Sequence, residues 1–267
     1  MKRWRYVLLV LCTAVISISG TYLMNYFMKS EENKQKYEDI SEIGFPETEA
    51  DHEEENDQQD VKQSEDDFDY QSLIAMNSDC VGWIQIPGTD INYPVVQAAD
   101  NEFYLTHNFN RETAACGAIF MDYRNDVDAK AEHLILYGHQ MKDNSMFKQL
   151  NGYKEEIFYK EHPNIKLYLH EQKYEYEITA VYVTDVANGG GYYNYLHWNT
   201  RKEQLNYLQQ KMAGYQIYDT GKKVMETDEL LSLSTCEYSS DNGRLIVQAE
   251  KKGGNDRWQT NYMKCRS

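Results

Sequence analysis

Eight short runs rich in β-branched and aromatic residues dominate the chain between residues 81 and 250. Turn-forming residues separate them, and most of the runs are too short for an ordinary helix. Many short strands with few helices predict a closed β-barrel or a sandwich rather than a parallel α/β sheet. The predicted strands are residues 81–86, 93–96, 118–121, 133–137, 165–169, 174–186, 229–235 and 244–250.

Helical patterns interrupt the strands at three places. Residues 68–77 contain Leu73, Ile74 and Met76 and predict a short helix before the first strand. Residues 200–213, between the sixth and seventh strands, predict a longer helix because Leu205, Leu208 and Met212 recur at helical spacing. A further short helix is predicted over 144–150. The expected fold is therefore mainly β with inserted helices.

An apolar run from Val7 to Met28 precedes all of these elements. As a helix it would be about 33 Å long, and a hydrocarbon core is roughly 30 Å thick. Lys2, Arg3 and Arg5 precede the run, so the positive-inside rule places the N-terminus in the cytoplasm and the remainder outside. A cleaved signal peptide is the alternative, but the run is long for one. We expect residues 1–29 to be a single-pass signal anchor in the cell membrane.

The net charge of −16 is distributed unevenly along the 267 residues. Its acidic excess is concentrated between residues 31 and 70, and within this stretch Glu47 to Asp69 has too few apolar side chains to form a core. We expect residues 30–67 to form a solvated, extended linker, and residues 68–267 to form the folded domain outside the cell. A general nucleic-acid binder is excluded because it needs a basic surface.

Cys236 and Arg244 flank a turn-forming stretch, Ser239-Ser240-Asp241-Asn242-Gly243, between the last two predicted strands. If these strands form a hairpin, the thiol and the guanidinium lie side by side, where the cation can stabilise a thiolate or an oxyanion. His139 follows the fourth predicted strand, and a histidine beside a cysteine can accept and return its proton. The alternative is that Cys236 is a small buried apolar residue and His139 a structural one.

Metal and nucleotide sites have no support in the sequence. Cys-x-x-Cys and His-x-x-x-His pairs are absent, as are glycine-rich phosphate-binding motifs. We therefore expect neither a metal nor a cofactor.

The order His139, Leu233-Ser234-Thr235-Cys236 and Arg244, behind an N-terminal anchor, resembles the sortases, which are membrane-anchored cysteine transpeptidases of Gram-positive bacteria. The resemblance extends over about residues 68–250. Further matching segments are Gly82–Thr89, Tyr93–Gln97, Asp100–Leu105 and Gly117–Asp122. The helix before the first strand and the long helix between strands six and seven resemble class B of this family.

This resemblance implies an eight-stranded sortase β-barrel and a transpeptidase reaction. Cys236 would be the nucleophile, His139 the general acid and then base, and Arg244 would hold the substrate and, with the Glu237 backbone N–H, the oxyanion. The enzyme would cleave a C-terminal sorting motif of the Asn-Pro-x-Thr-Asn/Gly kind after Thr and form a thioester. An amine of cell-wall peptidoglycan, or a pilin Lys, would then accept the secreted protein.

Substrate contacts are also implied by the class B resemblance. They are Asn101, Leu105, Tyr195, Leu196, Ser234 and Glu237, although ordinary core packing is an equal alternative for Leu105, Tyr195 and Leu196. Two other functions stay open. One is another cell-wall cysteine enzyme such as an L,D-transpeptidase, although Thr235 replaces the Gly expected before its cysteine. The other is a catalytically silent, membrane-tethered binding module.

Overall fold

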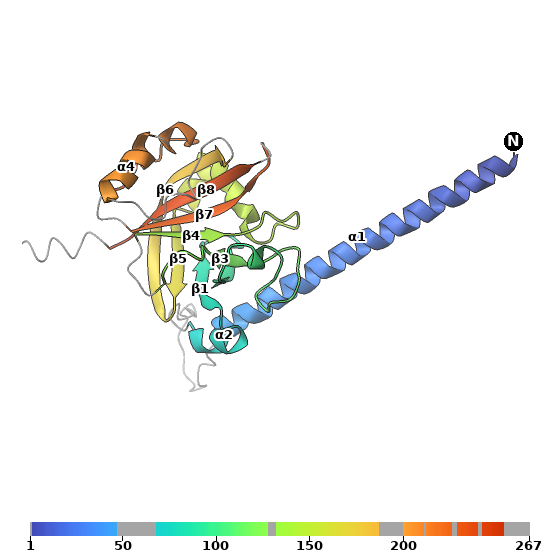
Figure 1. Ribbon diagram of the computed structural model, residues 1–267, viewed down its shortest axis with the longest axis horizontal. Helices are drawn as coiled ribbons and strands as arrows, with labels where there is room; N and C mark the ends of the chain where they lie inside the picture. The colour runs from blue at the N-terminus through green and yellow to red at the C-terminus, as the bar shows by residue number, and fades with distance from the viewer. Residues whose placement is uncertain are drawn as a thin grey trace, which may run out of the picture. The chain divides into compact units, whose positions relative to one another are not determined.

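The eight strands form one closed barrel in the order β1-β2-β3-β4-β7-β8-β6-β5 (Figure 1). The computed structural model describes residues 2–46, 68–127, 132–186, 200–210, 212–225, 229–239 and 242–253. The strands are β1 Cys80–Gln85, β2 Asn92–Val96, β3 Ile119–Met121, β4 His133–Tyr137, β5 Asn164–Leu169, β6 Gln172–Asp185, β7 Leu230–Glu237 and β8 Gly243–Lys251. The prediction of an eight-stranded barrel is confirmed, and the sandwich alternative is wrong.

Two of the strand pairs, β2 with β3 and β4 with β7, are parallel, and the other pairs are antiparallel. Side chains on the barrel strands that have no solvent exposure include Trp83, Ile135, Leu167, Leu233 and Val247. The first six residues of β7 are all buried. Because consecutive side chains of a strand point to opposite faces, both faces of β7 are covered along these six residues.

Two predicted helices are present beside the barrel. Helix α2 spans Tyr70–Met76, and the carboxylate of Asp69 caps it by accepting a 2.9 Å hydrogen bond from the Ser72 backbone N–H. Helix α4, Arg201–Gln210, and the 3₁₀ turn η4, Met212–Tyr215, lie between β6 and β7. Met212 packs against barrel residues such as Tyr182 and Ile246. The helix predicted over 200–213 is thus confirmed, as an α-helix to Gln210 and a 3₁₀ turn from Met212.

The helix predicted over 144–150 is displaced. The 3₁₀ helix η2 spans Phe147–Lys154, and a short helix that the sequence analysis missed, α3, spans Glu156–Glu161. Asn144 and Met146 have φ angles of 67° and 57°, which a right-handed helix does not allow. Helical structure therefore begins only after Met146. A further 3₁₀ turn, η1, spans Phe103–Leu105.

The N-terminal helix α1 spans Lys2–Gly44, so the prediction of an extended linker is wrong for residues 30–44. Elongating an existing helix avoids the cost of nucleation, and Glu, Lys and Gln are good helix formers. Pairs one turn apart support it, such as Lys36 with Glu32, at 2.9 Å between Nζ and Oε1. Residues 47–67 of the predicted linker lie outside the described residues.

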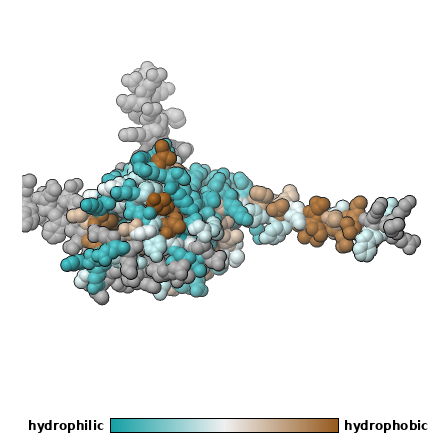
Figure 2. Space-filling view, turned by 90° about the horizontal axis from the view of Figure 1, so that it is seen from above, coloured by the Kyte–Doolittle hydropathy of each residue, from teal (hydrophilic) through white to brown (hydrophobic). Residues whose placement is uncertain are grey.

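Apolar side chains gather along the first part of α1 and are exposed to solvent, as Figure 2 shows. The helix contains a segment that is long and apolar enough to cross a membrane. A membrane-spanning anchor is compatible with this composition. Orientation and single-pass topology stay predictions.

The chain divides into two compact units, Met1–Asp39 and Ile40–Ser267. Within the second unit, the Phe45 ring packs 5.5 Å from the Trp83 ring and 5.3 Å from the Tyr168 ring. Asn92 also donates a 3.0 Å hydrogen bond to the Ser41 hydroxyl. The second compact unit therefore includes residues upstream of 68, and the division into 1–29, 30–67 and 68–267 stays a prediction.

Candidate active site

Cys236 and Arg244 are directly opposite each other in the β7–β8 ladder. The hairpin predicted from the sequence is therefore present. Residues opposite each other in an antiparallel pair carry side chains on the same face of the sheet. Cys236 is half-buried, whereas the six residues before it on β7 are buried. Cys236 is thus more exposed than the residues on either side of it, and it lies next to the strand that carries the guanidinium.

His139 reaches the same end of the barrel through the parallel pairing of β4 with β7. The last ladder pair joins Tyr137 and Ser234. Beyond it, the Gly138 N–H donates to the Ser234 carbonyl at 3.2 Å, and the Thr235 hydroxyl donates to the Gly138 carbonyl at 2.8 Å. The structure therefore brings His139, Cys236 and Arg244 together at one end of three adjacent strands.

The imidazole of His139 is held in place by a backbone carbonyl group. Its Nε2 atom lies 2.6 Å from the Leu105 carbonyl oxygen. A carbonyl oxygen can only accept, so Nε2 carries the hydrogen, and Nδ1 is the acceptor of the neutral ring. Gly117 packs against the same ring, and a Cβ there would lie 3.1 Å from Cδ2. The ring orientation and the tautomer are both fixed by the segment that contains Leu105.

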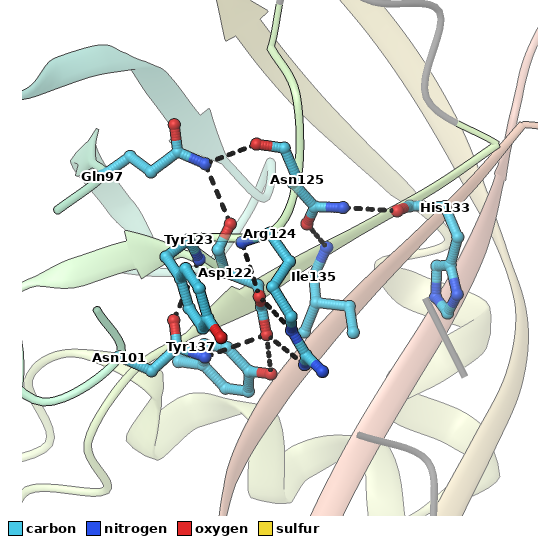
Figure 3. A network of polar contacts seen from close by, with 9 residues as sticks. All are labelled: Gln97, Asn101, Asp122, Tyr123, Arg124, Asn125, His133, Ile135 and Tyr137. Atoms are coloured by element: carbon cyan, nitrogen blue, oxygen red, sulfur yellow. Dashed lines mark hydrogen bonds and ion pairs between the residues drawn. The ribbon is translucent and has the colours of Figure 1, made fainter. Parts of the chain in front are cut away.

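Asn101 takes part in a polar network centred on the buried Asp122 (Figure 3). Its amide nitrogen donates to Asp122 Oδ2 at 3.0 Å, and its amide oxygen accepts from the Tyr123 N–H at 3.0 Å. Both ends of the Asn101 amide are therefore engaged within the protein. Sequence reasoning predicted Asn101 as a substrate contact and did not foresee this structural role.

Asp122 also accepts hydrogen bonds from Arg124 and from the Tyr137 hydroxyl, the latter at 2.8 Å. Burial opposes ionisation of this carboxyl, but these donors outweigh it and lower the pKa of Asp122 below its usual value. Because Tyr137 ends β4, the network supports the strand that carries His139. Sequence reasoning missed Asp122 as a functional candidate, because its partners come from separate segments.

Glu237, the residue after Cys236, is 8% exposed and forms an ion pair with Lys154. Its carboxylate lies 2.6 Å from Lys154 Nζ and accepts a 2.9 Å hydrogen bond from the Ser239 N–H. Burial would raise the pKa of Glu237, but the bonds from Lys154 and Ser239 outweigh it and lower that pKa to about 2. The side chain predicted to contact substrate is therefore tied to η2.

The remaining predicted substrate contacts have different surroundings. The Leu105 side chain is 40% exposed, whereas Ser234 is buried in β7. Tyr195 and Leu196 lie outside the described residues. Within the ranges that the structure describes, no three His, Cys, Asp or Glu side chains gather as metal ligands would.

Gln140 is a site residue that sequence reasoning missed. Its amide nitrogen donates to the Cys236 carbonyl oxygen at 2.9 Å. Its position directly after His139 was the one available signal, but nothing in the sequence indicates that its side chain turns toward β7. No sequence pattern singled out Lys154 as a site residue. It is the last residue of η2, beyond the helix that was predicted over 144–150.

Comparison with known proteins places this geometry in a family. The Sortase domain model matches residues 84–252. Sortase B of Listeria monocytogenes is 38% identical over 67% of this chain and 72% of its own length. Sortase B of Staphylococcus aureus is 30% identical over 94% of this chain and 97% of its own length.

The solved Staphylococcus aureus sortase B–substrate complex superposes with a TM-score of 0.69 at 30% identity, and the match covers 84% of this chain and 98% of that one. The family resemblance that rested on a few motifs thus extends over nearly the whole fold. The chain belongs to the sortase family, and it is a cysteine transpeptidase of class B.

Proposed function

We propose that this transpeptidase cleaves a C-terminal sorting motif of the Asn-Pro-x-Thr-Asn/Gly type after Thr and transfers the secreted protein to an amine. The acceptor is an amine of cell-wall peptidoglycan, or a pilin Lys. The observation that carries the proposal is the placement of His139, Cys236 and Arg244 at one end of the adjacent strands β4, β7 and β8. The Staphylococcus aureus sortase B solved as a substrate complex supports a substrate site on this fold.

In the first half-reaction, the Cys236 thiol gives its proton to His139 Nδ1, and Sγ attacks the carbonyl carbon of the motif's Thr to form a tetrahedral oxyanion. The C–N bond then breaks, and His139 Nδ1 delivers a proton to the departing amine. Assigning this task to Nδ1 follows from the hydrogen bond of Nε2 to Leu105. The product is a thioester between Cys236 and the secreted protein.

In the second half-reaction, the acceptor amine attacks the thioester carbon and gives its proton to His139 Nδ1. The C–S bond breaks, the new amide forms and the thiol is regenerated. Exclusion of water during this step would favour transfer over hydrolysis. Cys236 is thus the attacking group in the first half-reaction and the leaving group in the second, and His139 Nδ1 carries the proton in both.

Arg244 stabilises the oxyanion in both half-reactions. One of its five N–H donors binds the Gly243 carbonyl at 2.9 Å, which orients the guanidinium at the start of β8. Its other donors supply charge-assisted hydrogen bonds to the substrate and to the oxyanion, together with the Glu237 backbone N–H.

For substrate binding, we assign apolar contact with the peptide to the exposed Leu105 side chain. Tyr195, Leu196 and Ser234 stay proposed contacts. Asn101 and Glu237 would act through their backbone or their neighbours, since their polar side-chain groups are engaged by Asp122 and Lys154.

The helix α1 would anchor the enzyme as a single membrane pass with its N-terminus in the cytoplasm. The catalytic unit would then face secreted proteins and the cell wall. Both proposed partners, the secreted protein and the cell wall, lie on the side of the membrane where this orientation places the catalytic unit.

The experiment uses the full-length chain in detergent micelles and a panel of quenched peptides that vary Asn-Pro-x-Thr-x, with and without an amine acceptor. Mass spectrometry should detect cleavage after Thr, a thioester on Cys236 and an amine-dependent ligated product. An unreactive Cys236 would overturn the assignment of the nucleophile. A reactive Cys236 without any cleavage would overturn the motif and leave the nucleophile in place.

A further inference from the structure

Past the end of β4, the side chain of Gln140 continues the connection between the segments that carry the proposed base and the proposed nucleophile. We propose that Gln140 is a positioning residue that sets the placement of Cys236 relative to His139, through a relay from Lys148. The proposal rests on the roles proposed above for Cys236 and His139. Gln140 itself touches no reacting atom.

The β4–β7 ladder ends at the pair Tyr137 and Ser234, before either catalytic candidate. Two side-chain hydrogen bonds continue the connection on both sides of His139. On one side, the Thr235 hydroxyl binds the Gly138 carbonyl at 2.8 Å. On the other, the Gln140 amide nitrogen binds the Cys236 carbonyl at 2.9 Å. The spacing of the His139 and Cys236 backbones therefore depends on side chains as well as on the sheet.

The Gln140 carboxamide is held at both ends. Its oxygen accepts a 3.2 Å hydrogen bond from Lys148 Nζ. A lysine can only donate and a carbonyl can only accept, so the two partners fix which end of the amide faces Cys236. With Lys148 on its oxygen, the amide presents its N–H group to β7.

Lys148, where the relay begins, belongs to a segment that is packed against the barrel. Lys148 lies in η2, whose Phe147 and Leu150 side chains have no solvent exposure. The Phe147 N–H also donates to the His139 carbonyl at 2.9 Å. The same 3₁₀ helix therefore holds His139 directly and Cys236 through Gln140. Packing of η2 thus fixes both segments against a single element.

The hydrogen bond acts on the peptide unit that follows the nucleophile. The Cys236 carbonyl and the Glu237 N–H belong to one planar peptide group, so holding the carbonyl sets the direction of the N–H. That N–H is the proposed partner of Arg244 at the oxyanion. Loss of the Gln140 amide should therefore misalign the thiol and an oxyanion donor, while β7 stays paired with β4 and β8.

The test compares full-length wild type in detergent micelles with Gln140→Met, which keeps the length of the side chain and removes its amide. Lys148→Met removes the anchor of the relay. The matched control is Gln149→Met, because Gln149 lies in the same 3₁₀ helix and binds Asp90 instead. Each variant is assayed for peptide turnover, for alkylation of Cys236 by iodoacetamide at neutral pH, and for thermal unfolding by circular dichroism.

We expect Gln140→Met to lower kcat roughly ten-fold with little change in KM, because misplacement of reacting groups affects the chemical step. Alkylation of Cys236 should slow in the same variant. Lys148→Met should change both rates in the same direction but less, and Gln149→Met should match wild type. Unfolding temperatures should stay close to that of wild type.

Wild-type rates of turnover and alkylation in a folded Gln140→Met variant would overturn the positioning role. A change in KM alone would overturn it as well, because it would indicate a binding effect. If Gln140→Met fails to fold, unchanged rates in Lys148→Met would count against the relay. An unreactive thiol in the wild type would instead refute the proposed nucleophile, and the alkylation assay separates this outcome because it needs no sorting motif.

Discussion

Cys236 on β7 lies opposite Arg244 on β8, one ladder pair before the strands separate. The pairing fixes the two backbones at neighbouring positions without any direct bond between the side chains. A guanidinium is thereby placed beside the thiol by the sheet itself, and one of its donors is held by the Gly243 carbonyl. The hairpin therefore places Arg244 beside Cys236, as the oxyanion role proposed for it requires.

Replacing Arg244 tests that role most directly. Arg244→Ala should cost about 2–4 kcal/mol of transition-state stabilisation, measured from kcat/KM. Arg244→Lys should recover part of the loss, because it keeps the charge but lacks the planar fork of donors. Cys236→Ala should abolish turnover and His139→Ala nearly so. The control Lys251→Ala removes a cation that pairs with Glu229 at the other end of β8 and should leave kcat/KM unchanged. Near-full turnover in Arg244→Ala would remove Arg244 from the mechanism.

The Lys154–Glu237 ion pair predicts a pH-dependent contribution to stability. The pKa of Glu237 in the folded protein is about 2, below the usual 4.5. Its contribution is therefore fully present above about pH 4.5 and is lost as the pH falls toward 2. Glu237→Gln should lower the free energy of unfolding at neutral pH by about 1–2 kcal/mol, since the partly exposed lysine is screened by water.

Chemical denaturation of wild type and Glu237→Gln across this range checks the expectation. The two stabilities should converge as the pH falls. The control Glu156→Gln removes an exposed ion pair with Lys160 and should change little at any pH. A difference that stays constant down to pH 2 would show that the charge of Glu237 is not its cause.

Gly117 offers a way to disturb His139 without changing a polar group. Its φ is 59°, and an added Cβ would lie 2.5 Å from the Tyr104 carbonyl oxygen and 3.1 Å from the Leu105 carbonyl oxygen. Gly117→Ala should therefore displace the acceptor that binds His139 Nε2 and reduce kcat. Gly117→Ala should also lower the free energy of unfolding by more than the roughly 1–2 kcal/mol that a left-handed backbone conformation alone costs a residue with a Cβ.

Gly221→Ala is the matched control for that variant. Gly221 has a φ of 72°, but a Cβ there would meet nothing within 4 Å. It should show the backbone strain alone, with full turnover. Equal kinetic parameters for the two variants, measured with the same peptide, would argue against the packing of Gly117 on His139 as a functional contact.

Truncation distinguishes the sequence-based domain boundary from the structural one. A chain of residues 40–267 should keep the stability of the compact unit. A chain of residues 68–267 loses Phe45 and its contacts with Trp83 and Tyr168, which should cost about 2–4 kcal/mol. Denaturant unfolding of both chains measures the difference. Equal stabilities would restore the boundary at residue 68, and Phe45→Ala in the longer chain should reproduce most of any loss.

The strands could be predicted because their signal is local. Alternating or continuous β-branched and aromatic runs marked all eight, and the turn after Cys236 placed it opposite Arg244. The helix over 30–44 was missed because charge composition suggested a solvated chain, whereas continuity with the preceding apolar helix favoured helix. The start of η2 was misplaced because the positive φ values of Asn144 and Met146 leave little trace in the sequence.

The site could be predicted only in part, for a related reason. His139, Cys236 and Arg244 lie at strand ends, so their meeting follows from strand pairing. The contacts of Leu105, Gln140 and Lys154 depend on how loops and η2 pack against the barrel, which no local pattern encodes. Asn101 and Glu237 were predicted by resemblance, but their side-chain partners Asp122 and Lys154 appear only in three dimensions.

The barrel order has a consequence for how the enzyme matures. The partner of β4 on one side is β7, which follows two further strands and α4 in the chain, and β8 then closes the barrel by pairing with β6. Such long-range pairings form late, because their loops are costly to close. A growing polypeptide that ends before β7 contains His139, the proposed base, but not Cys236, the proposed nucleophile. Cys236 and Arg244 both lie on the β7–β8 hairpin, which completes the barrel. The proposed active site is therefore assembled only when the barrel closes.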